Sequence, residues 1–114
     1  WMRSSGLQLE VRCDDADEVA CLVAAHWAWP ASGGLLVANP VPAEAALPRE
    51  VVEGAIERSL SAAREQGVAG KAVTPFLLAR LAEETEGRTL AANEALVVSN
   101  AGLAGRIAVA LAGR

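Results

Sequence analysis

The side chains best suited to thiol or metal chemistry stand close together near the start of the sequence. Cys13 and Cys21 are eight residues apart, and His26, the only histidine, follows five residues later. Zinc sites use closer cysteine pairs, or ligands one turn apart on a helix face, so this spacing does not favour a metal site. We expect two reduced, partly buried thiols in a cytoplasmic protein.

Lys71 is the only lysine, so chemistry that needs an amine side chain rests on one position. It follows Gly70 in a stretch that we expect to link two helices, where a solvated side chain is the simplest interpretation. A lysine can also neutralise a phosphate as a point charge. Thr74 is expected to cap the next helix, whose first amides could alternatively face an anion.

Asn39 is a candidate binding residue because of the element expected before it. Leu7, Leu9 and Val11 alternate with polar residues, which predicts a half-buried strand. A helix capped by Asp14 or Asp15 should follow and extend to about Trp27.

The apolar run at 35–37 predicts a second strand, buried on both faces. Residues 7–38 therefore indicate a right-handed βαβ unit with parallel strands. Asn39 lies at the carboxyl end of its second strand, where ligands bind in open α/β sheets. The alternative for Asn39 is an Asx-type turn before Pro40.

Three further helices are predicted after this unit. The first begins near Pro48 and ends at Gly67. The second begins at Thr74-Pro75 and ends by Gly87, and the third extends from about Thr89 to about Leu111. Two strands do not make a stable sheet, so we expect an α/β fragment of a larger α/β/α sandwich. Residues 1–114 would be the C-terminal portion of that single domain, with further strands upstream.

Composition excludes several classes of protein. Apolar residues make up 53% of the 114 residues, which argues against disorder. Ten basic and fourteen acidic residues give a net charge of −4, so a nucleic-acid partner is not expected. No uninterrupted apolar run reaches the roughly 18 residues of a membrane span, and an acidic run near the N-terminus interrupts any signal peptide.

Three motifs carry a resemblance to a known family. They are RSSG at 3–6, GLLVANPVP at 34–42, and a long block with GKAVTPFLL at 70–78, LAANEALV at 90–97 and Asn100-Ala101. In order and spacing they resemble the C-terminal part of pseudouridine-5'-phosphate glycosidases, the IndA-like family. The resemblance covers essentially the whole chain. It departs at Glu94, where an aliphatic residue is expected, and at Ser99, where asparagine is common.

The resemblance implies a specific reaction. Such enzymes reversibly split the C–C glycosidic bond of pseudouridine 5'-phosphate to give uracil and ribose 5-phosphate. A lysine amine forms a covalent adduct with the opened ribose, a glutamate donates a proton, and aspartates hold a divalent metal, typically Mn²⁺. An imine is the electron sink that such a C–C cleavage needs. The family has an α/β/α fold and is expected to form a homotrimer.

The catalytic groups of that family have no counterpart in this sequence. The nucleophilic lysine, the glutamate and the metal-binding aspartates lie upstream of the matching region, and Lys71 is not at the nucleophile's place. The chain alone should therefore be inactive and should need the N-terminal part of the same protein. The residue that carries over is Asn93, whose amide is suited to a ribose hydroxyl or a uracil edge.

Two other interpretations remain open. The chain could be a non-catalytic helical module for interaction or oligomerisation, in which Trp27 and Trp29 belong to a subunit contact. It could also be a homologue with altered chemistry, because Glu94 adds a charge beside Asn93. Asn93 itself could simply bond the backbone near its helix start.

Overall fold

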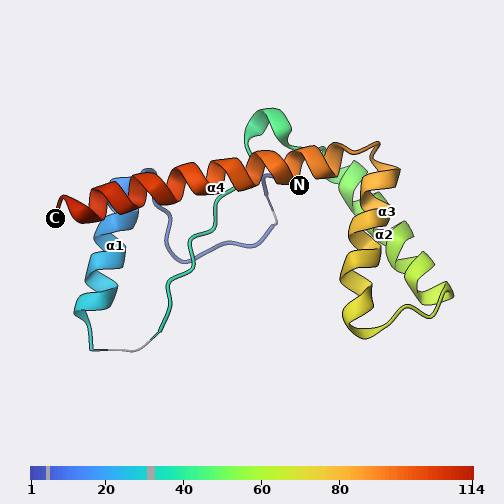
Figure 1. Ribbon diagram of the computed structural model, residues 1–114, viewed down its shortest axis with the longest axis horizontal. Coiled ribbons are helices and arrows are strands. Elements are labelled where there is room, and N and C mark those ends of the chain that lie inside the picture. Colours follow the sequence, from blue (N-terminus) through green and yellow to red (C-terminus); the bar gives the residue numbers. More distant parts are fainter. Residues whose placement is uncertain (5, 31–32) are drawn as a thin grey trace. The chain divides into compact units, whose positions relative to one another are not determined.

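The computed structural model describes residues 1–4, 6–30 and 33–114, so Ser5 of the RSSG motif lies outside the described residues. Within them the secondary structure is helical, and no strand is present in those ranges. Four α-helices and two short 3₁₀ helices follow one another along the chain (Figure 1). They are α1 (Ala16–Ala28), η1 (Ala43–Ala45), α2 (Arg49–Glu65), η2 (Gly70–Ala72), α3 (Val73–Glu84) and α4 (Arg88–Ala112).

The expected α/β fold, with a βαβ unit in an α/β/α sandwich, is therefore wrong for this chain. The segments 7–11 and 35–37 have no regular structure, although their sequences alternate or are continuously apolar as strands require. A strand exists only when a neighbour accepts its backbone hydrogen bonds. Neither segment is paired as a strand in the described residues, and Leu7 is 83% and Leu36 90% exposed.

The chain divides into two units, each described here by itself. The first comprises Trp1–Ser5 and Pro40–Leu96, and the second comprises Gly6–Asn39 and Val97–Arg114. The helix α4 contributes residues to both.

A small apolar core holds the first unit together. Val41, Leu47, Val52 and Ala92 are buried in one cluster, and Trp1 is among the partly buried side chains that pack against it. The backbone N–H of Leu47 donates to the carbonyl oxygen of Trp1 at 3.0 Å, which ties the N-terminus to the segment before α2. This core fixes the first turns of α4, because Ala92 belongs to it.

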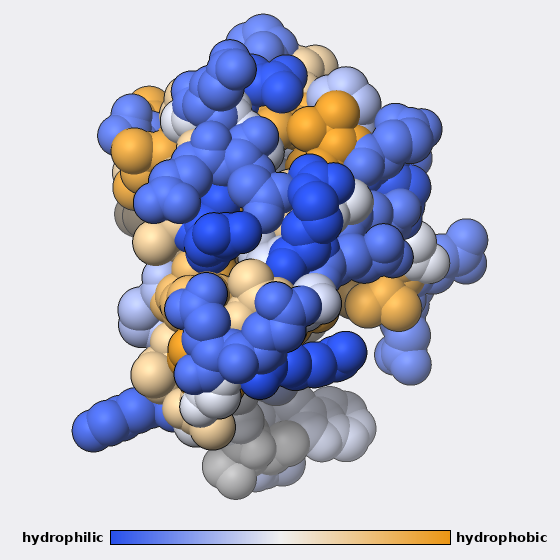
Figure 2. Space-filling view, turned by 90° about the vertical axis from the view of Figure 1, so that its right-hand side faces the viewer, coloured by the Kyte–Doolittle hydropathy of each residue, from blue (hydrophilic) through white to orange (hydrophobic). Residues whose placement is uncertain are grey.

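The helices α2 and α3 pack against each other as a hairpin in the same unit. Gly67 ends α2 in the left-handed region at φ +66°, and the N–H of Val68 donates to the carbonyl of Ala63 at 2.9 Å. This is the glycine C-cap that the sequence predicted. Arg58 and Glu84 pair across the hairpin at 2.7 Å. Hydrophilic side chains cover much of the face shown in Figure 2.

The start of α3 differs from the prediction. The helix begins at Val73, its N-cap is Ala72, and no side chain caps it. The 3₁₀ helix η2 leads directly into α3, so the backbone is already helical before Thr74. An N-cap needs a non-helical backbone. Thr74 is therefore an exposed residue inside the first turn rather than the cap.

A sharp turn joins α3 to α4. Glu86 and Gly87 both have positive φ, at 53° and 80°. Thr85 and Thr89 are buried on either side of this turn, and their hydroxyl oxygens lie 3.0 Å apart. The Thr85 hydroxyl also donates to the carbonyl of Leu81 at 2.7 Å and accepts from the N–H of Thr89 at 3.2 Å.

In the second unit, α1 begins where the sequence predicted. Asp15 is its N-cap, and its carboxylate accepts from the N–H of Glu18 at 2.9 Å. The Glu18 carboxylate in turn accepts from the N–H of Asp14 at 2.8 Å, so two free amides near the helix start are satisfied. Val19, Ala20 and Val23 form the buried side of α1, whereas Trp27 and Trp29 are exposed.

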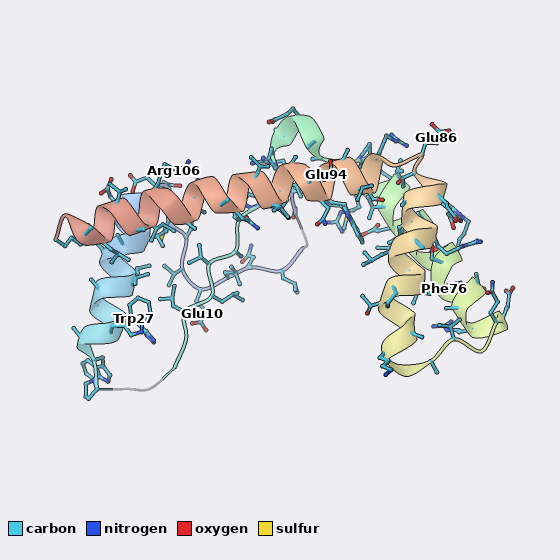
Figure 3. All side chains as sticks on the ribbon, in the orientation of Figure 1. Glu10, Trp27, Phe76, Glu86, Glu94 and Arg106 are labelled. Atoms are coloured by element: carbon cyan, nitrogen blue, oxygen red, sulfur yellow. The ribbon has the colours of Figure 1, made fainter. Side chains whose placement is uncertain are left out.

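The helix α4 is long and has little apolar cover. Leu90, Val97, Val98 and Val109 are all more than half exposed. By length and composition alone, α4 is long and apolar enough to cross a membrane, a property that core helices of soluble proteins share. Two charges, Glu94 and Arg106, interrupt its apolar sequence and project from the helix (Figure 3). Asn93, Ser99 and Asn100 interrupt it as well, so the helix contains no uninterrupted apolar run of membrane-spanning length.

Candidate functional site

Asn39 is held by hydrogen bonds to α4. Its side-chain Nδ2 donates to Ser99 Oγ at 3.0 Å and to Asn100 Oδ1 at 2.9 Å. These three residues, which we call the amide cluster, all belong to the second unit. The strand that was expected to position Asn39 is missing, and a pair of polar residues some 60 positions later in the sequence fixes its amide instead.

The amide cluster has unused hydrogen-bonding capacity. Both N–H hydrogens of Asn39 are engaged, whereas its Oδ1 and the Asn100 Nδ2 have no partner among the described residues. Asn39 is half-buried and Asn100 is exposed, so a ligand can reach the cluster. It is uncharged, which suits polar neutral groups better than anions.

Asn93 lies on α4 in the first unit. Its neighbour Ala92 is buried in the core, and the Asn93 side chain is exposed. Within the part of the chain that the structure describes, the Asn93 amide makes no hydrogen bond, so the alternative of a backbone-bonding helix-start residue is not realised. Its donors and its acceptor are free for a ligand. Asn39 and Asn93 belong to different units, so the structure does not join them in one described site.

Glu94 and Lys71 are both exposed. Lys71 lies in η2, at the tip of the α2–α3 hairpin, and no ion pair joins it to another residue of the described ranges. That position agrees with a solvated linker lysine.

The cysteines and the histidine do not form a metal centre. Cys13 is half-buried, Cys21 is exposed, and both are free thiols. In residues 1–4, 6–30 and 33–114, no three His, Cys, Asp or Glu side chains come together as metal ligands. The residues described here therefore do not fit a manganese ion, and no chemical step of this chain is derived through one.

His26 is half-buried against a neighbouring aromatic ring. Its ring centroid lies 6.2 Å from that of Trp27, in an edge-on arrangement. The buried Nε2 atom of His26 has no hydrogen-bond partner in the described chain. No acid or base partner for this nitrogen is therefore in place for catalysis among the described residues.

Sequence reasoning missed two features. Ser99 was noted only as a departure from the family pattern, and Asn100 only as the end of a motif, because the sequence does not show which distant residues meet Asn39. The second is a shallow cleft of about 210 Å³ in the first unit, between residues 44–48 and the first turns of α4. Its lining is mainly apolar, with Glu44 and Arg88 as the charged groups.

Comparison with known proteins identifies similar sequences. Residues 1–110 match the family described as Indigoidine synthase A like protein. A pseudouridine-5'-phosphate glycosidase of Paracoccus denitrificans is 50% identical over 112 residues, which are 98% of this chain and 37% of that protein. One of Methylobacterium nodulans is 47% identical over 113 residues, which are 99% of this chain and 34% of that protein.

A solved structure is similar as well. The prealnumycin C-glycosynthase AlnA, crystallised with ribulose 5-phosphate, is 30% identical and superposes with a TM-score of 0.88. The match covers 98% of this chain and 37% of that one. The chain spans about a third of the length of AlnA and of each of the two glycosidases.

Proposed function

Because this chain belongs to the Indigoidine synthase A like family, we propose that it forms about a third of a pseudouridine-5'-phosphate glycosidase. The whole enzyme would reversibly cleave the C–C glycosidic bond of pseudouridine 5'-phosphate to uracil and ribose 5-phosphate. The observation that carries this proposal is the 50% identity to the Paracoccus denitrificans glycosidase across 98% of the chain.

The catalytic groups would come from the remaining two-thirds of the fold. C–C cleavage requires a group that accepts the electrons of the breaking bond, and an imine formed by a lysine amine serves this purpose. Lys71 is exposed in η2, away from any cluster of acid or base groups in the described residues. The nucleophilic lysine, the proton-donating glutamate and the aspartates for Mn²⁺ would therefore lie in the N-terminal part of the same protein.

The contribution of this chain would be to bind substrate. Asn93 presents a free carboxamide, which can both donate to and accept from a ribose hydroxyl or a uracil edge. Asn39 would contact substrate through the free oxygen of its amide.

The exposed apolar side chains support a partner polypeptide. Val97, Val98 and Val109 on α4 are each at least 60% exposed, and a soluble monomer rarely leaves such side chains uncovered together. We assign their cover to the N-terminal part of the same protein. A homotrimer and a cytoplasmic location complete the proposal, and the two free cysteines are in keeping with a reducing compartment.

The same exposed face favours a second candidate, a non-catalytic module that uses α4 for interaction or oligomerisation. The two candidates differ in what they require. A glycosidase part needs Asn93 for activity, whereas an interaction module needs only its apolar face. C-glycoside synthesis, the activity in the name of AlnA, is less favoured because that protein is 30% identical, against 50% for the glycosidase.

The test is a chimera in which this chain replaces the matching 37% of the Paracoccus denitrificans protein. The chimera should cleave pseudouridine 5'-phosphate, and Asn93→Ala should reduce kcat/KM about tenfold or more, because a polar contact to substrate is lost. Gln66→Ala, which removes an exposed amide at the end of α2, is the matched control and should leave activity unchanged.

Three results would count against the proposal. An inactive chimera that folds would remove the glycosidase assignment and leave the interaction module. Activity that is the same in Asn93→Ala and Gln66→Ala would remove Asn93 from the site. Activity on another C-glycoside alone would support the altered chemistry that Glu94 keeps open.

A further inference from the structure

We propose that Asn39 and Asn100 form a donor–acceptor pair that recognises the imide edge of the uracil ring, with Ser99 as a positioning residue. The inference rests on the proposed glycosidase function and specifies which part of the substrate the amide cluster binds. It is carried by the hydrogen bonds of the amide cluster, which all lie within the second unit.

The hydrogen bonds decide what the cluster can offer a ligand. Asn39 has two N–H hydrogens, and Ser99 Oγ and Asn100 Oδ1 accept one each. A carboxamide carries two donors and a carbonyl acceptor, so Asn39 is left with its oxygen. The Asn100 oxygen already accepts a hydrogen bond from Asn39, and the N–H₂ group of Asn100 is unengaged. The pair thus presents one unengaged acceptor group, the Asn39 carbonyl, and one unengaged donor group, the N–H₂ of Asn100.

This result does not depend on which end of each amide is oxygen. If both carboxamides were turned end for end, Asn100 would donate to Asn39, and the Ser99 hydroxyl would donate as well. Asn39 would then be left with its N–H₂ group and Asn100 with its oxygen. In either arrangement one amide keeps an unengaged donor group and the other keeps an unengaged acceptor group.

Among the chemical groups of the proposed substrate, the uracil edge fits this pair best. An imide places an N–H beside a C=O in one plane, so it can donate to one amide and accept from the other. A phosphate offers only acceptors and negative charge, and the free amide oxygen would repel it. The cluster also contains no cation, which is the group that usually binds phosphate.

Ser99 fixes the orientation of the pair. It is half-buried on α4, next to Asn100, and it accepts one of the two Asn39 hydrogens. Without that bond, Asn39 would keep a single tether and could rotate about its side-chain torsions. Ser99 therefore acts through Asn39 and needs no contact with substrate.

The experiment uses the same chimera in the direction of synthesis, with uracil and ribose 5-phosphate varied separately. Asn39→Ala and Asn100→Ala should each raise KM for uracil about tenfold or more and change KM for ribose 5-phosphate by less than about twofold. Ser99→Ala should raise KM for uracil by a smaller factor, and Ser99→Thr, which keeps the hydroxyl, should restore it. Circular dichroism of each variant checks that the fold is retained.

N-methylated uracils provide a second measurement that needs no turnover. Calorimetry should show that the chimera binds uracil more tightly than 3-methyluracil, because a methyl group on N3 removes the imide N–H. In contrast, 1-methyluracil keeps the imide edge and should keep its hydrogen bonds to the cluster. Asn39→Ala should lose most of this discrimination. Gln66→Ala, an amide outside the cluster, should keep it.

Each outcome separates the inference from the function on which it rests. A chimera that binds uracil with this discrimination but does not turn over would overturn the proposed function alone. An active chimera whose cluster variants raise KM for ribose 5-phosphate, or change neither KM, would overturn the inference alone. A chimera that neither turns over nor binds uracil would overturn both.

Discussion

Removing the Thr85 hydroxyl should strongly destabilise the first unit, although the hydroxyl is a small group. Thr85 is 0% exposed and Thr89 is 2% exposed, so neither can turn to water. In Thr85→Val the shape of the side chain is kept, but the Thr89 hydroxyl and the Thr89 N–H both lose the oxygen to which they are bonded. The Leu81 carbonyl keeps one partner, the N–H of Thr85.

The magnitude follows from these two abandoned donors. A buried polar group without a partner costs about 1 to 3 kcal/mol, so the loss of two partners in Thr85→Val should lower the free energy of unfolding by about 2 to 6 kcal/mol. No cavity is made and helix propensity hardly changes, since valine and threonine are nearly equal in both respects. The matched control is Thr74→Val in the same unit, where the side chain is exposed and the change should stay within about 0.5 kcal/mol.

Trp1 offers a suitable reporter for this measurement. It packs against the core of the first unit, whereas Trp27 and Trp29 are exposed and can be replaced by phenylalanine. Urea unfolding followed by Trp1 fluorescence then gives the free energy of that unit. If Thr85→Val lost no more stability than Thr74→Val, the assignment of buried hydrogen bonds at this turn would be wrong.

Three further predictions concern single side chains. Val52→Ala should lower the free energy of unfolding by about 2 to 3 kcal/mol, because Val52 is fully buried in the core. Val98→Ala, at an exposed position of α4, should change it by less than about 0.5 kcal/mol, and equal effects in urea titrations would contradict the core assignment. Asp15→Ala should lower the stability of α1 by about 1 kcal/mol because the N-cap hydrogen bond is lost, whereas Asp15→Asn should keep that bond. Amide hydrogen exchange in the first turn of α1 measures both effects. Gly87→Ala should destabilise the protein by about 1 to 2 kcal/mol, because φ at this position is +80°. Gly105→Ala lies within α4, where a Cβ meets no atom within 4 Å, and should stabilise the protein by about 0.5 to 1 kcal/mol. Urea midpoints that shifted in the same direction for both variants would contradict this distinction.

The helices could be predicted because their signals are local. Asp15 stands directly before an apolar face of period 3.6, and Gly67 follows the last residue of such a face, so both helix ends are encoded within a few residues. The prediction that Thr74 caps α3 was wrong because the backbone before Thr74 is already helical in η2, and the local sequence gives no signal for this 3₁₀ helix.

The strands could not be predicted correctly because a strand depends on its neighbours. The alternation at 7–11 records which side chains suit a sheet, but not whether another strand is present to pair with it. The amide cluster shows the same limit for the candidate site. Asn39 was found from its place in the chain, whereas its contacts with Ser99 and Asn100 cross about 60 residues and follow only from the tertiary structure.

The position of Lys71 has a practical consequence. A protease specific for lysine has one site in this sequence, at the exposed tip between α2 and α3. A single cut there would leave α1 and α2 on one fragment and α3 and α4 on the other. Since α2 and α3 pack side by side and Arg58 pairs with Glu84 across the cut, the fragments should stay associated after cleavage. The hairpin tip is thus a natural point for splitting, permuting or inserting into this chain.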